Sequence, residues 1–167
     1  GELQPIRYAS PVASAQVKTA VLLAGLNLSG ETCVTEPHLS RDHTERMLVH
    51  MGAALHREGA TVRLQGGRPL RTDSFVVSGD PSSAAFFLVA ALITAQSDLT
   101  VSRVCVNPTR TGYLSVLERM GADIERGKET LLSGEPVADL RVRSCSLRAT
   151  EILPEDVPSC IDEIPVL

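Results

Sequence analysis

The chain has 167 residues, of which 43% are hydrophobic and 3% aromatic, and its net charge is -4. This length is enough for one large or two small domains with a well-formed core, and a composition dominated by Ala, Val and Leu favours layered α/β packing. The weak negative charge provides no global electrostatic field for nucleic acid or for an anionic membrane. An anionic ligand would therefore depend on local positive groups.

The cysteines give no sign of a metal site or a disulfide framework. No two form a CxxC pair and no histidine stands at zinc-ligand spacing, so reduced thiols are expected. The four are Cys33, Cys105, Cys145 and Cys160. The longest uncharged run, 82–97, is shorter than the roughly 20 residues that cross a bilayer, and we interpret it as a buried helix. The chain opens on Gly1 without a signal peptide, and we expect it to be a piece of something longer.

In chain order, the first half predicts a strand, an apolar helix, a strand, an amphipathic helix and two further strands. The apolar helix is "SAQVKTAVLLAGL" at 14–26, followed by a strand at 32–34. The amphipathic helix opens "SRDHTERMLVHMGAALHREGATVRL" at 40–64, which also holds the two strands. Both helices begin at a serine, the preferred type of N-cap. Gly52, which closes the second helix, is expected to adopt the left-handed conformation of a C-cap.

The second half repeats this order. "SSAAFFLVAALITA" is the apolar helix, "LTVSRVCV" the strand and "TRTGYLSVLERMGADIE" the amphipathic helix. Arg41 and Arg110 are 69 residues apart, and so are Gly52 and Gly121. Repeats of this size are supersecondary units that bury their faces on neighbours. Because the first helix of each copy is apolar nearly all round, we expect it inside a ring of elements, with the sheets outside.

Two shorter segments follow in the second half of the chain. Residues 127–138 contain Gly134 and Pro136, which indicates turns around a short hairpin. A third copy starts where 140–142 precede "VPSCIDEIPVL", and the chain stops before its helix is complete.

Two cations stand near the predicted helix starts, where the helix dipole disfavours positive charge. Lys18 lies one turn into the first helix, and Arg41 directly follows Ser40. If Ser14 is an N-cap, the free backbone amides of the first turn create a spot that binds anions, and a bound phosphate would relieve both cations. The alternative is that the serines are ordinary caps and Lys18 snorkels to water.

The motifs "SAQVK.AVLLAGL", "SRDHTERML", "GDPSSAAFFLVAAL", "NPTRTG", "MGADIE", "DLRVR" and "IDEIPVL" resemble the middle of the 5-enolpyruvylshikimate-3-phosphate synthase family, over essentially the whole chain. The resemblance implies two lobes, each of three βαβαββ units with buried helices. Residues 1–77 would be the last unit of one lobe, and 78–167 the first unit and the start of the second unit of the other.

The resemblance also implies an activity. Enzymes of this family transfer the enolpyruvyl group of phosphoenolpyruvate to the 5-hydroxyl of shikimate 3-phosphate, through a tetrahedral intermediate that eliminates phosphate. The reaction belongs to aromatic amino-acid biosynthesis in the bacterial cytoplasm and needs no metal and no organic cofactor. The partners would be these two small molecules, with no nucleic acid and no membrane, and an incomplete chain is expected to self-associate.

Carried over residue by residue, the resemblance predicts a sugar-phosphate site in the first half. Ser14 and Gln16 match a serine-x-glutamine that holds shikimate 3-phosphate, and Ala15 between them would contribute its backbone. Arg41 matches a basic residue at the sugar phosphate, and Ser40 lies in the same loop.

One carboxylate in the second half is predicted to be catalytic. Asp162 matches an aspartate that binds the ring hydroxyls and is the candidate base for the 5-hydroxyl. Its neighbour Glu163 is expected to have a structural role. Lys18 is expected to support the anionic field without touching substrate. Arg110 is expected to pair with a helix end or a loop carbonyl.

Two other functions stay open. UDP-N-acetylglucosamine enolpyruvyl transferase shares the fold, but its hallmark cysteine stands in a glycine-rich loop, and none of the four cysteines here does. A non-catalytic fragment or phosphate-binding module is the other alternative, because the family's early Lys-Ser and Arg, its "GNAGT" loop and its late Glu, Arg and Lys cluster have no counterpart in this chain.

Overall fold

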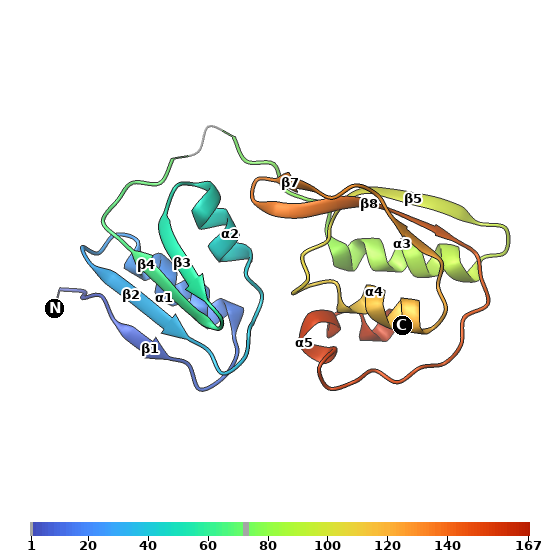
Figure 1. Ribbon diagram of the computed structural model, residues 1–167, viewed down its shortest axis with the longest axis horizontal. Helices are drawn as coiled ribbons and strands as arrows, with labels where there is room; N and C mark the ends of the chain where they lie inside the picture. Colours follow the sequence, from blue (N-terminus) through green and yellow to red (C-terminus); the bar gives the residue numbers. More distant parts are fainter. Residues whose placement is uncertain (1, 72–73) are drawn as a thin grey trace. The chain divides into compact units, whose positions relative to one another are not determined.

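A computed structural model describes residues 2–71 and 74–167. The chain divides into two compact units, Gly1–Phe75 and Val76–Leu167, and each is a mixture of helices and strands as the sequence predicts (Figure 1). Among the described residues, no helix has the length and apolar character needed to cross a membrane.

The first unit holds one four-stranded sheet and two helices. In chain order its elements are β1 (Arg7–Ala9), α1 (Ala15–Gly25), β2 (Glu31–Thr35), α2 (His43–His50), β3 (Ala54–Glu58) and β4 (Thr61–Gln65). The strand order is β1-β2-β4-β3, with β1 and β2 parallel and the other pairs antiparallel. A parallel pair needs a long crossover, and α1 provides it. Leu22 of α1 and Leu48 of α2 pack with Val62 and Leu64, which alternate along β4.

The second unit repeats this plan with a longer sheet. Its elements are α3 (Pro81–Ile93), β5 (Asp98–Cys105), α4 (Gly112–Arg119), β6 (Ile124–Arg126), β7 (Thr130–Leu132), β8 (Glu135–Arg143), α5 (Val157–Cys160) and the 3₁₀ turn η1 (Ile164–Val166). β8 is central and pairs antiparallel with β5, β6 and β7. A single parallel bridge between Gly79 and Val104 stands where the first unit has the parallel pair β1 and β2.

The glycine caps of the two amphipathic helices confirm the repeat. Gly52 and Gly121 have φ values of 83° and 92°, in the left-handed region. In each case the next amide turns back onto the helix: Ala53 donates to the Leu48 carbonyl at 2.8 Å, and Ala122 to the Leu117 carbonyl at 3.0 Å.

The predicted hairpin is also present. Leu132 pairs with Glu135 across the two-residue turn Ser133–Gly134, and both turn residues have positive φ, as a type I′ turn requires.

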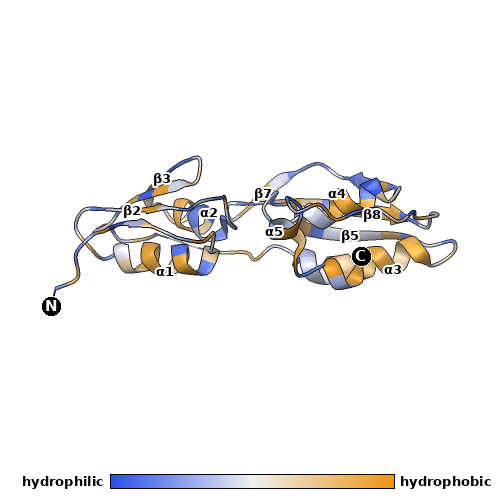
Figure 2. Cartoon of the chain, turned by 90° about the horizontal axis from the view of Figure 1, so that it is seen from below, coloured by the Kyte–Doolittle hydropathy of each residue, from blue (hydrophilic) through white to orange (hydrophobic). Residues whose placement is uncertain are grey.

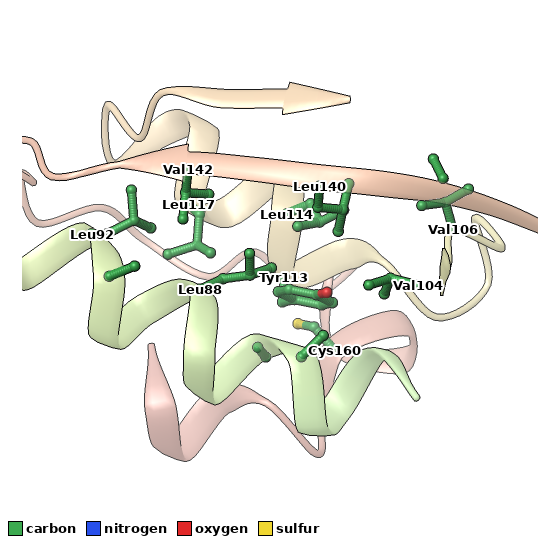
Figure 3. Packing of buried hydrophobic residues seen from close by; sticks show 14 residues of the cluster. Leu88, Leu92, Val104, Val106, Tyr113, Leu114, Leu117, Leu140, Val142 and Cys160 are labelled. Atoms are coloured by element: carbon green, nitrogen blue, oxygen red, sulfur yellow. The ribbon is translucent and has the colours of Figure 1, made fainter. Parts of the chain in front are cut away.

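The core of the second unit lies between α3, α4 and the sheet (Figure 3). Leu88 of α3, Leu117 of α4 and Leu140 of β8 are fully buried there. The ring of Tyr113 fills the centre of this cluster, and its hydroxyl has no hydrogen-bond partner among the described residues. This packing fixes the start of α4, which directly follows the segment that contains Arg110.

Helices α1 and α3 are covered on one face only. Within each unit a single sheet lies against the helix, so the expected enclosure is met on the inner face alone. On α3 the inner stripe includes Ala84, Leu88 and Ala91, whereas Phe86 and Phe87 are 57% and 63% exposed. Figure 2 shows α3 with a largely hydrophobic colouring.

Candidate functional site

The first candidate site is built on the N-terminus of α1. Ser14 is the N-cap, as predicted: its Oγ accepts a hydrogen bond from the Val17 amide at 3.3 Å. Ala15 and Gln16 are the first two helical residues, and their amides have no acceptor among the described residues. Unpaired first-turn amides and the positive end of the helix dipole favour an anion here.

Glu36, immediately after β2, ties this helix start to the loop that follows. Its Oε1 accepts from the Ser14 backbone amide at 3.0 Å. The Ser40 hydroxyl donates to both carboxylate oxygens, at 2.7 and 2.9 Å. The structure therefore brings Ser14 and Ser40 together on one buried carboxylate, and Arg41 follows directly in the same loop, half-buried.

Lys18 is the counter-charge of Glu36. Its Nζ lies 2.9 Å from Glu36 Oε2 and 2.8 Å from Glu45 Oε1, and all three side chains are at most 5% exposed. The snorkelling alternative is therefore wrong, because the ammonium group points into the unit. Two carboxylates engage the Lys18 ammonium group. This position is compatible with the expectation that Lys18 does not touch substrate.

Ser40 is not the N-cap of α2, which corrects another prediction. The helix begins at His43 with Asp42 at the N-cap position. Asp42 is buried and accepts from Arg46 Nε and Arg57 Nη1, each at 2.9 Å. The helix starts late because Ser40 is engaged by Glu36 and the first helical bond runs from the Arg46 amide to the Asp42 carbonyl, at 3.1 Å.

The second candidate site belongs to the second unit and contains Asp162. Arg110 Nη1 lies 2.8 Å from Asp162 Oδ2, and Arg110 Nη2 donates to Ser82 Oγ at 2.6 Å. Ser82 in turn donates to Glu163 Oε1. The Asp162 side chain is half-exposed, whereas Glu163 is fully buried. Arg110 was expected to pair with a helix end or a carbonyl; it pairs with side chains, and one of them is the predicted base.

Two pKa values in this region are shifted. Burial tends to raise the pKa of Asp80, the N-cap of α3, but hydrogen bonds from the Ser83 hydroxyl and from the amides of Ser83 and Ser82 outweigh it and lower the pKa. Burial, reinforced by the negative charge of Glu163, raises the pKa of Tyr113 far above its usual range. Asp80 is therefore an ionised cap, and Tyr113 stays a neutral core residue.

The four cysteines are free thiols and do not form a reactive site. Cys33 and Cys105 are buried in strands, and burial raises the pKa values of Cys105 and Cys160. A thiol with a raised pKa is a poor nucleophile. This environment does not fit the cysteine-based alternative among the enolpyruvyl transferases.

The repeated α/β units are those of an enolpyruvyl-transferase fold. Among solved structures, the enolpyruvyl transferase NikO from Streptomyces tendae matches 79% of this chain and 31% of its own with a TM-score of 0.58 and 20% identity, which shows the fold alone.

The family follows from stronger matches. The family model of EPSP synthase (3-phosphoshikimate 1-carboxyvinyltransferase) matches residues 1–167, and the chain belongs to this family. It is 56% identical to the 3-phosphoshikimate 1-carboxyvinyltransferases of Geobacter sulfurreducens and Thermosynechococcus vestitus, over 99% of this chain and 38% of each relative. The EPSP synthase from Acinetobacter baumannii superposes with a TM-score of 0.92 and 46% identity, over 98% of this chain and 38% of that one. The chain thus spans well under half the length of these relatives.

Sequence reasoning missed Glu36 and the role of Glu45. Neither glutamate stands out in the sequence as a partner of Lys18, because both are distant from it along the chain. The available signal was Lys18 itself, because a lysine within an apolar helix that packs on a sheet requires a buried acid nearby.

Proposed function

We propose that this chain is the central part of an enzyme that transfers the enolpyruvyl group of phosphoenolpyruvate to the 5-hydroxyl of shikimate 3-phosphate. The family model that matches residues 1–167 supports this activity, and the arrangement of Ser14, Ser40 and Arg41 around the start of α1 supports a sugar-phosphate site. A location in the bacterial cytoplasm is part of the same proposal and rests on the bacterial relatives.

In this proposal the first unit binds the phosphate of shikimate 3-phosphate. The Ser14 hydroxyl accepts from the Val17 amide, so its own hydrogen is available to a phosphate oxygen. The amides of Ala15 and Gln16 and the guanidinium of Arg41 would add further donors, and charge-assisted hydrogen bonds of this kind are the strong ones.

The second unit contributes the base. Asp162 would take the proton of the 5-hydroxyl as that oxygen bonds to the central carbon of phosphoenolpyruvate, whose methylene carbon gains a proton from an acid. The resulting tetrahedral intermediate then loses phosphate while a base removes a proton from its methyl group, which forms the enol ether of the product. Arg110 orients the Asp162 carboxylate by donating to its Oδ2 at 2.8 Å, and a base requires a fixed orientation.

The lobe assignment is proposed on the same basis. Residues 1–77 would close one lobe, and 78–167 would open the other. The repeat of helices, strands and glycine caps supports counting them as successive units of one architecture.

The phosphate site is tested by comparing shikimate 3-phosphate with shikimate as ligands of the full-length protein. Isothermal titration should show tighter binding of the phosphorylated sugar, and Arg41→Ala should remove most of this preference, at a cost of roughly 1.5–3 kcal/mol. Arg68→Ala, which removes an exposed arginine of the same unit, is the matched control and should keep the preference. Equal binding of the two sugars by the unmodified protein would refute the site.

A further inference from the structure

We propose that Glu36 is a positioning residue of the sugar-phosphate site. Its buried carboxylate fixes the start of α1 and the loop of Ser40 and Arg41 in one arrangement. This inference rests on the proposed function, because that function places Ser14 and Arg41 among the phosphate ligands and Ser40 in the loop that carries Arg41. Glu36 is held by Ser14, Ser40 and Lys18, and it has no contact with the substrate in this proposal.

Both carboxylate oxygens of the buried Glu36 are engaged by donors. Oε1 accepts from the Ser14 amide and from the Ser40 hydroxyl, and Oε2 accepts from Ser40 and lies beside the ammonium of Lys18. A buried carboxylate with several donors is strongly held, since removal of any one partner leaves a desolvated group unsatisfied. Glu36 therefore links Ser14 to Ser40 through a carboxylate that has little conformational freedom.

The charge of Glu36 would repel a phosphate if it were uncompensated. Lys18 supplies the compensation inside the unit, where solvent does not screen the charges. This accounts for a lysine in the inner stripe of α1. Aligning α1 and α3 at their N-caps, Ser14 with Asp80, places Lys18 opposite the buried Ala84, so packing alone is satisfied by a small apolar residue at this position.

The Ser40 hydroxyl has one hydrogen, and in this structure Glu36 receives it. Ser40 can then offer only lone pairs to a ligand unless the hydroxyl turns away from Glu36. The contribution of Ser40 to the site is therefore mainly to set the path of the loop, which places the backbone of Arg41 beside the helix start. Glu36 acts through Ser14 and Ser40 alike.

The sharpest test is Glu36→Gln in the full-length protein, because glutamine keeps the shape but replaces one acceptor oxygen with a donor. In either orientation its NH₂ group faces a donor, the Ser14 amide or the Lys18 ammonium. We expect the Kd for shikimate 3-phosphate to rise on the order of tenfold while the Kd for shikimate stays within about twofold. In steady-state kinetics the KM for shikimate 3-phosphate should rise, with the KM for phosphoenolpyruvate unchanged.

Controls separate positioning from a general loss of stability. Glu58→Gln changes an exposed glutamate of the same unit and should leave both Kd values unchanged. Glu36→Asp keeps the negative charge beside Lys18, so the fold is retained even if Glu36→Gln unfolds, but the shorter side chain cannot reach both serines and should also weaken shikimate 3-phosphate binding. Destabilisation alone lowers the amount of active protein, and therefore kcat, without changing KM.

The outcomes distinguish this inference from the proposed function. If the unmodified protein binds shikimate 3-phosphate and shikimate equally, the phosphate site itself is wrong. If the unmodified protein prefers the phosphorylated sugar and folded Glu36→Gln or Glu36→Asp binds it with the same Kd, the site stands and the positioning role of Glu36 is overturned.

Discussion

Asp162 and Glu163 are adjacent carboxylates in very different environments. Glu163 is fully buried and accepts from Ser82, which makes it part of the packing around the start of α3. Asp162 has a half-exposed side chain and an ion pair with the nearly buried Arg110. A base needs access to its substrate and a fixed orientation, and of the two residues only Asp162 has both.

Replacing Asp162 by asparagine should therefore affect the reaction more than binding. In the full-length protein we expect Asp162→Asn to lower kcat by roughly 10²- to 10⁴-fold, because the base acts in the transition state. The Kd for shikimate 3-phosphate should change by less than about tenfold, since asparagine can still hydrogen-bond a ring hydroxyl. Stopped-flow turnover together with titration calorimetry measures both quantities. Asp123→Asn, at an exposed aspartate of the same unit, should retain full turnover, and unchanged kcat in Asp162→Asn would make Asp162 a scaffold residue.

Helix α1 has the proposed phosphate site at its N-terminus and a buried ion cluster on its inner face. Lys18, one turn after the N-cap, lies between Glu36 of the loop after β2 and Glu45 of α2. The Thr19 and Thr44 hydroxyls are 2.6 Å apart and add a second polar link between the two helices. The ion cluster thus connects α1, the loop after β2 and α2, and its loss should loosen all three segments.

This connection predicts a large stability effect at Lys18. Lys18→Met leaves two buried carboxylates without a counter-charge, and breaking such a pair should lower the free energy of unfolding by about 3–5 kcal/mol. Urea denaturation of the full-length protein, followed by circular dichroism, measures the change. The triple variant Lys18→Met, Glu36→Gln, Glu45→Gln should recover part of the loss, because it leaves no isolated buried charge.

Lys128→Met is the matched control, since this exposed lysine can be replaced at a cost below about 0.5 kcal/mol. A urea midpoint for Lys18→Met equal to that of the unmodified protein would mean that the ammonium group reaches water after all.

At the scale of elements, the sequence predicted what local patterns determine. The apolar run at 14–26 and the caps Gly52 and Gly121 depend on neighbouring residues only, and the structure confirms them. The predicted start of α2 at Ser40 was wrong. Serine is a typical N-cap residue, but the Ser40 hydroxyl donates to Glu36, which lies outside the helix. The buried position of Lys18 could not be predicted for the same reason, since its partners come from other elements.

At the scale of the whole molecule, the repeat explains both the fold and its exposed apolar surface. Each unit packs its helices against one sheet, and the outer faces of α1 and α3 carry side chains such as Leu23, Phe86 and Phe87 that remain exposed in this chain. Repeat units bury such faces on neighbouring units. The relatives are more than twice as long as the chain, so they contain material that could supply those neighbours.

The 167-residue chain by itself should therefore lack synthase activity and self-associate. The proposed lobe assignment gives it one unit of one lobe and the beginning of the other, whereas the reaction requires two anions to be held and shielded from water. Exposed Phe86, Phe87 and Ile93 form an apolar face that favours association between copies. The test measures phosphate release from phosphoenolpyruvate plus shikimate 3-phosphate beside light scattering on the purified chain, with the full-length protein as the positive control. Turnover by a monodisperse monomer would show that the residues sufficient for the chemistry all lie between Gly1 and Leu167.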